Sequence, residues 1–168
     1  MPNRWKPNVT VAAVIERDRR FLLVEEQTAE GLRLNNPAGH LDPGESLVQG
    51  CIRETLEETA HGFRPTALVG VYLSRLPSLR RETDMPQTIT YLRFAFCGEL
   101  GEFLAQRRLD HAIVRTVWLT ADEIRASVQV HRSPVLLQCT EDYLAGARYP
   151  IELLHSDLGG APRVNAQG

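Results

Sequence analysis

Residues 39–62, GHLDPGESLVQGCIRETLEETAHG, carry the strongest pattern in this chain. Ser46 is followed three residues later by Gln49, which is a capping-box pattern. The turn at residues 42–44 is therefore predicted to lead into a helix over residues 47–60. The apolar residues that recur at helical spacing and form a stripe predicted to be buried are Leu47, Val48, Cys51, Ile52 and Leu56.

Three glutamates, Glu54, Glu57 and Glu58, share one face of this predicted helix, because they stand at i, i+3 and i+4. Arg53 is the one nearby residue that offsets their charge. Glu54 and Glu58 repel each other at i,i+4, which costs a few tenths of a kcal/mol, roughly the reverse of a favourable pair. Such a face is either a solvated acidic surface or a site for a hard divalent cation such as Mg²⁺, which binds carboxylates, water and substrate phosphates.

The charged residues of this stretch resemble the Nudix box, G-x5-E-x7-R-E-U-x-E-E-x-G-U, of the MutT-like Nudix hydrolase family. Three residues depart from that pattern: Thr55 stands at an aliphatic position, Ala60 replaces the closing glycine, and His61 occupies the last aliphatic position. Gly62 is predicted to move the end of the helix by two residues. The matching residues are Gly39, Glu45, Arg53, Glu54, Glu57 and Glu58.

This resemblance implies an α/β fold, an α/β/α sandwich with a central mixed β-sheet. It also implies that Glu54, Glu57 and Glu58 bind Mg²⁺, with Mn²⁺ as an alternative metal. The backbone carbonyl of Gly39 would add an oxygen ligand, and Arg53 would orient a carboxylate. Such a site activates water for phosphoryl transfer. Glu54 is our first choice for the general base, and a carboxylate on a later loop is the alternative.

Three further carboxylates are candidates for supporting roles. Glu45 either supports the site or is a charge at the helix entrance, where the helix dipole favours it. Glu102 and Asp110 lie between the last two predicted strands, where the family often places a catalytic carboxylate; the alternative is that each is a plain surface residue. His40 and His111 could bind phosphate, as could three arginines before the strand at residue 88; packing and solvated-loop roles are the alternatives. These arginines are Arg75, Arg80 and Arg81.

Composition narrows the class of protein. The chain has 168 residues, of which 43% are hydrophobic, enough for one domain over residues 7–154 with a flexible tail over residues 155–168. A formal charge of −2 argues against binding to nucleic acid or anionic membranes. The three cysteines are too widely spaced to indicate a disulfide framework or a zinc site. Without a predicted signal peptide or membrane span, we expect a cytoplasmic protein, either monomer or homodimer.

Strands are predicted before and after the central helix. Residues 9–16 and 21–26 are predicted to form a hairpin across the polar residues 17–20, and residues 31–35 form a weaker third strand. Residues 66–75, 88–97 and 114–119 follow as strands. Two helices are expected near the end, one capped by Thr120 or Asp122 and one over residues 133–145.

Over residues 7–154 the sequence resembles a bacterial phosphatase group within the Nudix family, including an RSP element at residues 132–134 and an RYP element at residues 148–150. That resemblance implies release of terminal phosphate from nucleoside triphosphates, nucleoside diphosphates and thiamine-type pyrophosphates. Two alternatives remain open: a Nudix pyrophosphatase acting on ADP-ribose or oxidised nucleotides, and a non-catalytic nucleotide-binding module.

Overall fold

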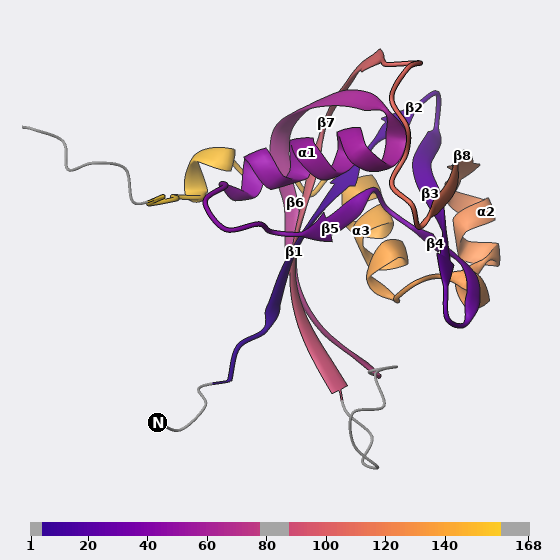
Figure 1. Cartoon of the computed structure of the whole chain (residues 1–168), viewed down its shortest axis with the longest axis horizontal. Helices are drawn as coiled ribbons and strands as arrows, with labels where there is room; N and C mark the ends of the chain where they lie inside the picture. Colours follow the sequence, from indigo (N-terminus) through magenta and orange to yellow (C-terminus); the bar gives the residue numbers. More distant parts are fainter. Residues whose placement is uncertain (1–4, 78–87, 159–168) are drawn as a thin grey trace, which may run out of the picture.

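Two β-sheets and three α-helices build the molecule, which a computed structural model describes over residues 5–77 and 88–158 (Figure 1). The first sheet is mixed and has the strand order β5-β1-β7-β6, in which β1 and β7 are parallel and the other pairs are antiparallel. Its strands are β1 (Asn8–Val14), β5 (Ala38–His40), β6 (His61–Pro77) and β7 (Thr88–Phe103). The second sheet is antiparallel and contains β2 (Glu16–Arg17), β3 (Arg20–Thr28), β4 (Gly31–Asn35) and β8 (Ile113–Thr120).

Strand β1 lies at the centre of the mixed sheet and is covered on both faces. Val11 and Ala13 belong to one apolar cluster, which includes Cys51 of helix α1 (Leu47–Thr59). Ala12 and Val14 belong to a second cluster with residues of α2 and α3. Successive side chains of a strand point to opposite faces, so a continuous apolar run indicates cover on both. The predicted α/β/α sandwich with a mixed sheet is therefore confirmed.

After β8 the described chain forms short helices that pack beside both sheets. Helix α2 (Ala121–Ala126) begins at Thr120, whose side chain accepts a hydrogen bond from the Glu123 N–H, so Thr120 rather than Asp122 is the cap. The 3-10 helix η1 (Val128–Val130) and helix α3 (Val135–Leu144) follow. A second 3-10 helix, η2 (Ile151–Leu153), precedes the end of the described chain.

The predicted hairpin at the start of the chain is wrong in one respect. Strand β1 pairs with β7 and β5, whereas β3 belongs to the second sheet. Only the two residues of β2 pair with β3, around a turn in which Asp18 and Arg19 both have positive φ. Two residues with positive φ make the turn type that suits a tight hairpin. The chain thus leaves one sheet after Val14 and enters the other.

Helix α1 begins as predicted and ends differently. Both hydrogen bonds of the capping box between Ser46 and Gln49 are present. The helix ends at Thr59, and Ala60 adopts the left-handed conformation with φ 57°, donating its N–H to the Leu56 carbonyl over 3.0 Å. Gly62 therefore does not move the helix end. Ala60 takes the conformation that a glycine usually supplies.

All three cysteines are free and buried in different parts of the sandwich. Cys51 lies on α1, Cys97 on β7 and Cys139 on α3. Burial raises the pKa of all three thiols, and that of Cys139 reaches about 11. The predicted core position of Cys51 is confirmed, since it is 1% exposed.

Candidate metal and phosphate site

Helix α1 turns two of its glutamates into the protein rather than toward solvent. Glu54 and Glu58 are each 8% exposed, whereas Ile52 of the predicted apolar stripe is 36% exposed. The buried face instead runs through Cys51, Thr55 and their helical neighbours. The Thr55 hydroxyl donates to the Cys51 carbonyl, which satisfies a polar group that would otherwise be costly to bury. A solvated acidic surface is thus excluded for two of the three glutamates.

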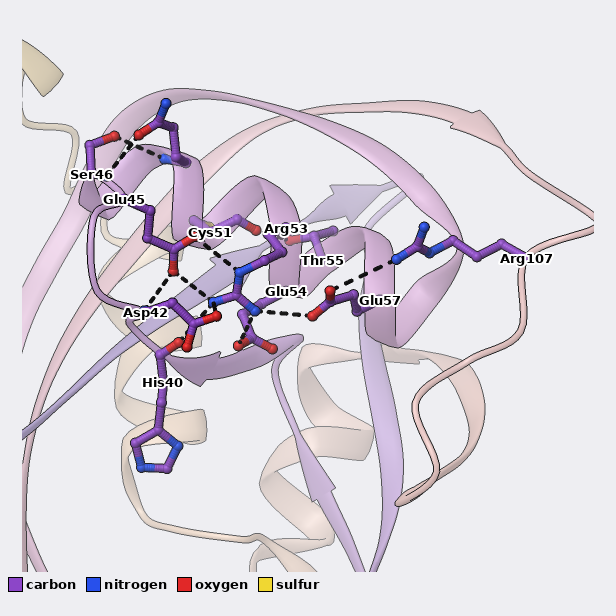
Figure 2. A network of polar contacts seen from close by, with 11 residues as sticks. His40, Asp42, Glu45, Ser46, Cys51, Arg53, Glu54, Thr55, Glu57 and Arg107 are labelled. Atoms are coloured by element: carbon purple, nitrogen blue, oxygen red, sulfur yellow. Dashed lines mark hydrogen bonds and ion pairs between the residues drawn. The ribbon is translucent and has the colours of Figure 1, made fainter.

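Arg53 forms hydrogen bonds with three glutamates and a backbone carbonyl of the site, as Figure 2 shows. Its Nε and Nη2 donate to the two oxygens of Glu45 over 3.0 and 2.7 Å. Its Nη1 donates to Glu54 Oε1 over 2.8 Å and to Glu57 Oε2 over 3.0 Å. The second Nη2 bond goes to the His40 carbonyl over 2.9 Å. All five donors of this guanidinium are therefore used, which fixes its plane and the carboxylates around it.

Glu45 contributes to this arrangement from the turn before α1. Besides binding Arg53, its Oε1 accepts the Asp42 N–H over 2.8 Å. The hydrogen bonds from Arg53 are the main reason that the pKa of Glu45 is lowered. The position of Glu45 agrees with a role in orienting Arg53, and its contacts go beyond those of a charge that merely favours the helix entrance.

Strand β5 is tied to the same helix at two points. The Ala38 N–H donates to Glu58 Oε2 over 2.8 Å, and the His40 carbonyl accepts from Arg53. Gly39 lies between these two residues. A Cβ atom built on Gly39 would stand 2.1 Å from the Glu54 carboxyl carbon, closer than side chains tolerate. Only glycine lets the backbone approach Glu54 in this way.

Burial changes the protonation of these carboxylates. The pKa of Glu54 is raised, chiefly because burial disfavours the charged form, against the pull of Arg53. The pKa of Glu58 rises to about 8 for the same main reason, and the charges of Glu54, Glu26 and Asp110 raise it further. Carboxyl groups in a cavity whose pKa is shifted by burial and by neighbouring charges are typical of functional sites.

A cavity of about 320 Å³ opens beside Glu54 and Glu58. Gly39, His40 and Asp42 line it next to the helix. The mixed sheet forms another part of its wall with residues that alternate along β1, β6 and β7, as expected for side chains on one face. These wall residues are Thr10, Ser74, Leu76, Tyr91 and Arg93.

The second sheet and the segment before α3 complete the cavity with charged groups. Glu26 of β3 and Arg132 line it, and Arg132 Nε lies 3.2 Å from Glu26 Oε1 as an ion pair. Burial is the main cause of the raised pKa of Glu26, and the charges of Arg132 and Arg93 oppose that shift. Sequence reasoning did not name Arg93, Arg132 or Glu26 as site residues, although Arg132 begins the RSP element at residues 132–134. The arginine in the middle of an otherwise apolar strand, TITYLRFAF, was the available signal.

The other predicted residues are only partly brought to the site. Asp110 lies beside it: its N–H donates to the Glu57 carbonyl over 3.1 Å, and its charge acts on Glu54 and Glu58. Glu102 is exposed within β7, because that strand continues to Phe103, so it is not on the loop where we expected it. Arg75 is exposed on β6 and His111 on the loop before β8, and neither lines the cavity. Arg80 and Arg81 lie outside the described residues.

The oxygen donors fit a divalent cation. Mg²⁺ is usually held by one or two carboxylates, with water and substrate phosphates completing its ligands. Glu54 and Glu58 supply two such carboxylates in the cavity. Glu57 is the helical neighbour of Glu58, and its Oε2 accepts a hydrogen bond from Arg53. Within residues 5–77 and 88–158, no three His, Cys, Asp or Glu side chains already converge as a complete metal site. The arrangement therefore suits a cation that substrate phosphates help to hold.

Comparison with known proteins places this architecture in a family. The NUDIX domain matches residues 6–139, and the chain therefore belongs to the Nudix family. It is a Nudix hydrolase acting on phosphorus-containing anhydrides. No helix within the described ranges is both long and apolar enough to span a membrane.

Individual relatives cover most of the chain. Phosphatase NudJ of Escherichia coli strain K12 is 34% identical over 151 residues, which are 89% of this chain and 92% of that protein. A NUDIX hydrolase from Nitrosomonas europaea is 50% identical, with a TM-score of 0.81 over 92% of this chain and 99% of its own. The NUDIX domain of Shewanella oneidensis NrtR, complexed with ADP ribose, shares the fold at 17% identity and a TM-score of 0.64, covering 85% of this chain and 90% of that one.

Proposed function

We propose that this protein is a Mg²⁺-dependent phosphatase that removes terminal phosphate from nucleoside triphosphates, nucleoside diphosphates and thiamine-type pyrophosphates. The observation that carries the proposal is the cavity, which two buried glutamates and two arginines line together. Similarity to Phosphatase NudJ over nearly the whole chain supports a phosphatase reaction, in which the terminal phosphate is released as orthophosphate. Three buried thiols agree with a reducing compartment such as the cytoplasm.

The residues of the proposed site would bind the metal ion and activate the attacking water. Bound Mg²⁺, or Mn²⁺ in its place, would neutralise charge on the phosphate oxygens and lower the pKa of water. Glu54, Glu57 and Glu58 would hold the cation together with the Gly39 carbonyl. Glu54 would accept the proton of the attacking water, with Asp110 as the alternative.

The remaining residues of the box maintain geometry. Arg53 binds both Glu54 and Glu57 through Nη1, so it restricts their rotamers. Glu45 in turn holds the guanidinium through two hydrogen bonds. Loss of either residue would leave the carboxylates present but misplaced, and small misplacements of catalytic groups are costly.

Product identification by phosphorus NMR tests the proposal. The protein is incubated with Mg²⁺ and GTP, GDP, thiamine pyrophosphate or ADP-ribose, and Glu54→Gln serves as the control for contaminating phosphatase. Orthophosphate from the first three compounds, absent with the variant, is the expected result. Pyrophosphate plus GMP from GTP, or AMP from ADP-ribose alone, would refute terminal phosphate release. Turnover of none of the four would contradict these substrates.

A further inference from the structure

The cavity has a cationic side that the Nudix box does not contain. Arg93 reaches it from β7, and Arg132 reaches it from the segment between η1 and α3. The backbone of Arg132 is fixed, because its N–H donates to the Leu34 carbonyl of β4 over 2.8 Å. One arginine from the mixed sheet and one from the segment before α3 thus meet around one cavity.

Hydrogen bonds within the described part of the chain leave much of the donor capacity of these arginines free. Arg93 Nη1 donates to Asn35 Oδ1 over a long 3.4 Å, and Arg132 is held by its ion pair with Glu26. An arginine offers five N–H donors in a planar fork. Donors that face a cavity without protein partners suit the oxygens of a phosphate.

One carboxylate, that of Glu26, interacts electrostatically with both arginines. Glu26 carries one negative charge and the two arginines carry one positive charge each, so these three side chains together keep one net positive charge. Glu26 Oε1 is buried and accepts no hydrogen bond among the described residues. Glu26 therefore holds Arg132 through the ion pair, acts on Arg93 through its charge alone, and cannot neutralise both arginines. A ligand with negative charge would complete the site.

We propose that Arg93 and Arg132 bind the free terminal phosphoryl group of the substrate, and so select compounds that end in a phosphate monoester-like group over compounds whose phosphates are all esterified. This inference rests on the proposed function and names the substrate class of the same site. A terminal phosphoryl group carries one more negative oxygen than an esterified phosphate. The arginine fork can bind two of its oxygens at once.

The kinetic test compares GTP with its γ-methyl ester, which differs by one charged oxygen. The wild type is expected to favour GTP in kcat/KM by roughly tenfold or more, the typical effect of one charge-assisted hydrogen bond. Arg132→Gln should lower kcat/KM for GTP by about tenfold and leave that for the ester nearly unchanged. Arg132→Lys should fall between the two, because lysine keeps the charge without the fork.

A neighbouring ion pair supplies the matched control. Arg115 of β8 pairs with Glu25, the residue before Glu26, and does not line the cavity. Arg115→Gln should therefore keep the wild-type preference for GTP. Arg93→Gln should lower the preference for GTP as Arg132→Gln does. Arg93 is half-buried in the mixed sheet, so this variant could fail to fold. In that case the Arg132 variants alone test the proposal. An unchanged preference in folded Arg132→Gln would overturn the proposal.

A binding measurement separates this inference from the proposed reaction. Calorimetric titration of inorganic pyrophosphate in the presence of Mg²⁺ needs no turnover. Binding about tenfold weaker in Arg132→Gln than in the wild type and Arg115→Gln would support the arginine site, even if NMR shows that GTP yields pyrophosphate. Equal binding by all three proteins would refute it, whichever product is formed.

Discussion

Gly39→Ala tests how closely the backbone of β5 must approach the helix. The new Cβ would stand 2.1 Å from the Glu54 carboxyl carbon, and ordinary contact begins at 3.4 Å, so the carboxyl must move by about 1.3 Å. Such a shift would break the 2.8 Å hydrogen bond from Arg53 and displace the proposed metal ligand. A displacement of about 1 Å at a catalytic group can cost roughly 100-fold in rate.

The assay is Mg²⁺-dependent phosphate release at several Mg²⁺ concentrations, with a melting curve to show that the variant is folded. We expect turnover about 100-fold lower, and half-maximal turnover should need a higher Mg²⁺ concentration because a metal ligand is displaced. Gly62→Ala is the matched control, because its Cβ would meet nothing closer than 3.8 Å and should leave turnover unchanged. Wild-type turnover by folded Gly39→Ala would refute the role given to Glu54 and its close contact with β5.

Three other outcomes are expected. Glu57→Gln should weaken Mg²⁺ binding and remove most turnover while the protein stays folded, and wild-type rates at saturating Mg²⁺ would contradict that role. Millimolar Mg²⁺ should raise the melting temperature, since a ligand at 100 times its Kd stabilises the folded state by about 2.7 kcal/mol; an unchanged curve would count against the site. In metal-free protein the Glu58 contribution to stability should be full below pH 4.5 and disappear as pH rises to about 8, because folding raises its pKa. Urea midpoints measured across this range should fall with pH, and Glu58→Gln should flatten that slope.

The local part of the site could be predicted from sequence. Spacing along one helix places Glu54, Glu57 and Glu58 on one face, and the Ser46–Gln49 capping box fixes where that helix begins. Helical spacing could not show which face is buried. Glu54 and Glu58 are enclosed because β5 and the cavity lie against them, and that contact depends on strands far away in sequence.

The non-local part was missed for the same reason. Arg93 and Arg132 are 39 positions apart in the sequence and come together only after both sheets form. The residue pattern around Arg93 correctly predicted a β-strand. It could not show that the Arg93 side chain would line a cavity together with Arg132. The turn at Asp18 and Arg19 lies within the predicted residues 17–20, but the pairing of β1 with β5 and β7 rather than with β3 depends on strands that are distant in the sequence.

The buried cysteines give this protein three internal reporters of motion. A thiol shielded from solvent, with a raised pKa, reacts with an alkylating reagent only when the surrounding structure opens. Cys51 would report separation of α1 from the mixed sheet, Cys97 the opening of β7, and Cys139 the release of α3. Labelling rates followed by mass spectrometry would therefore resolve which layer loosens first, without introducing any foreign probe.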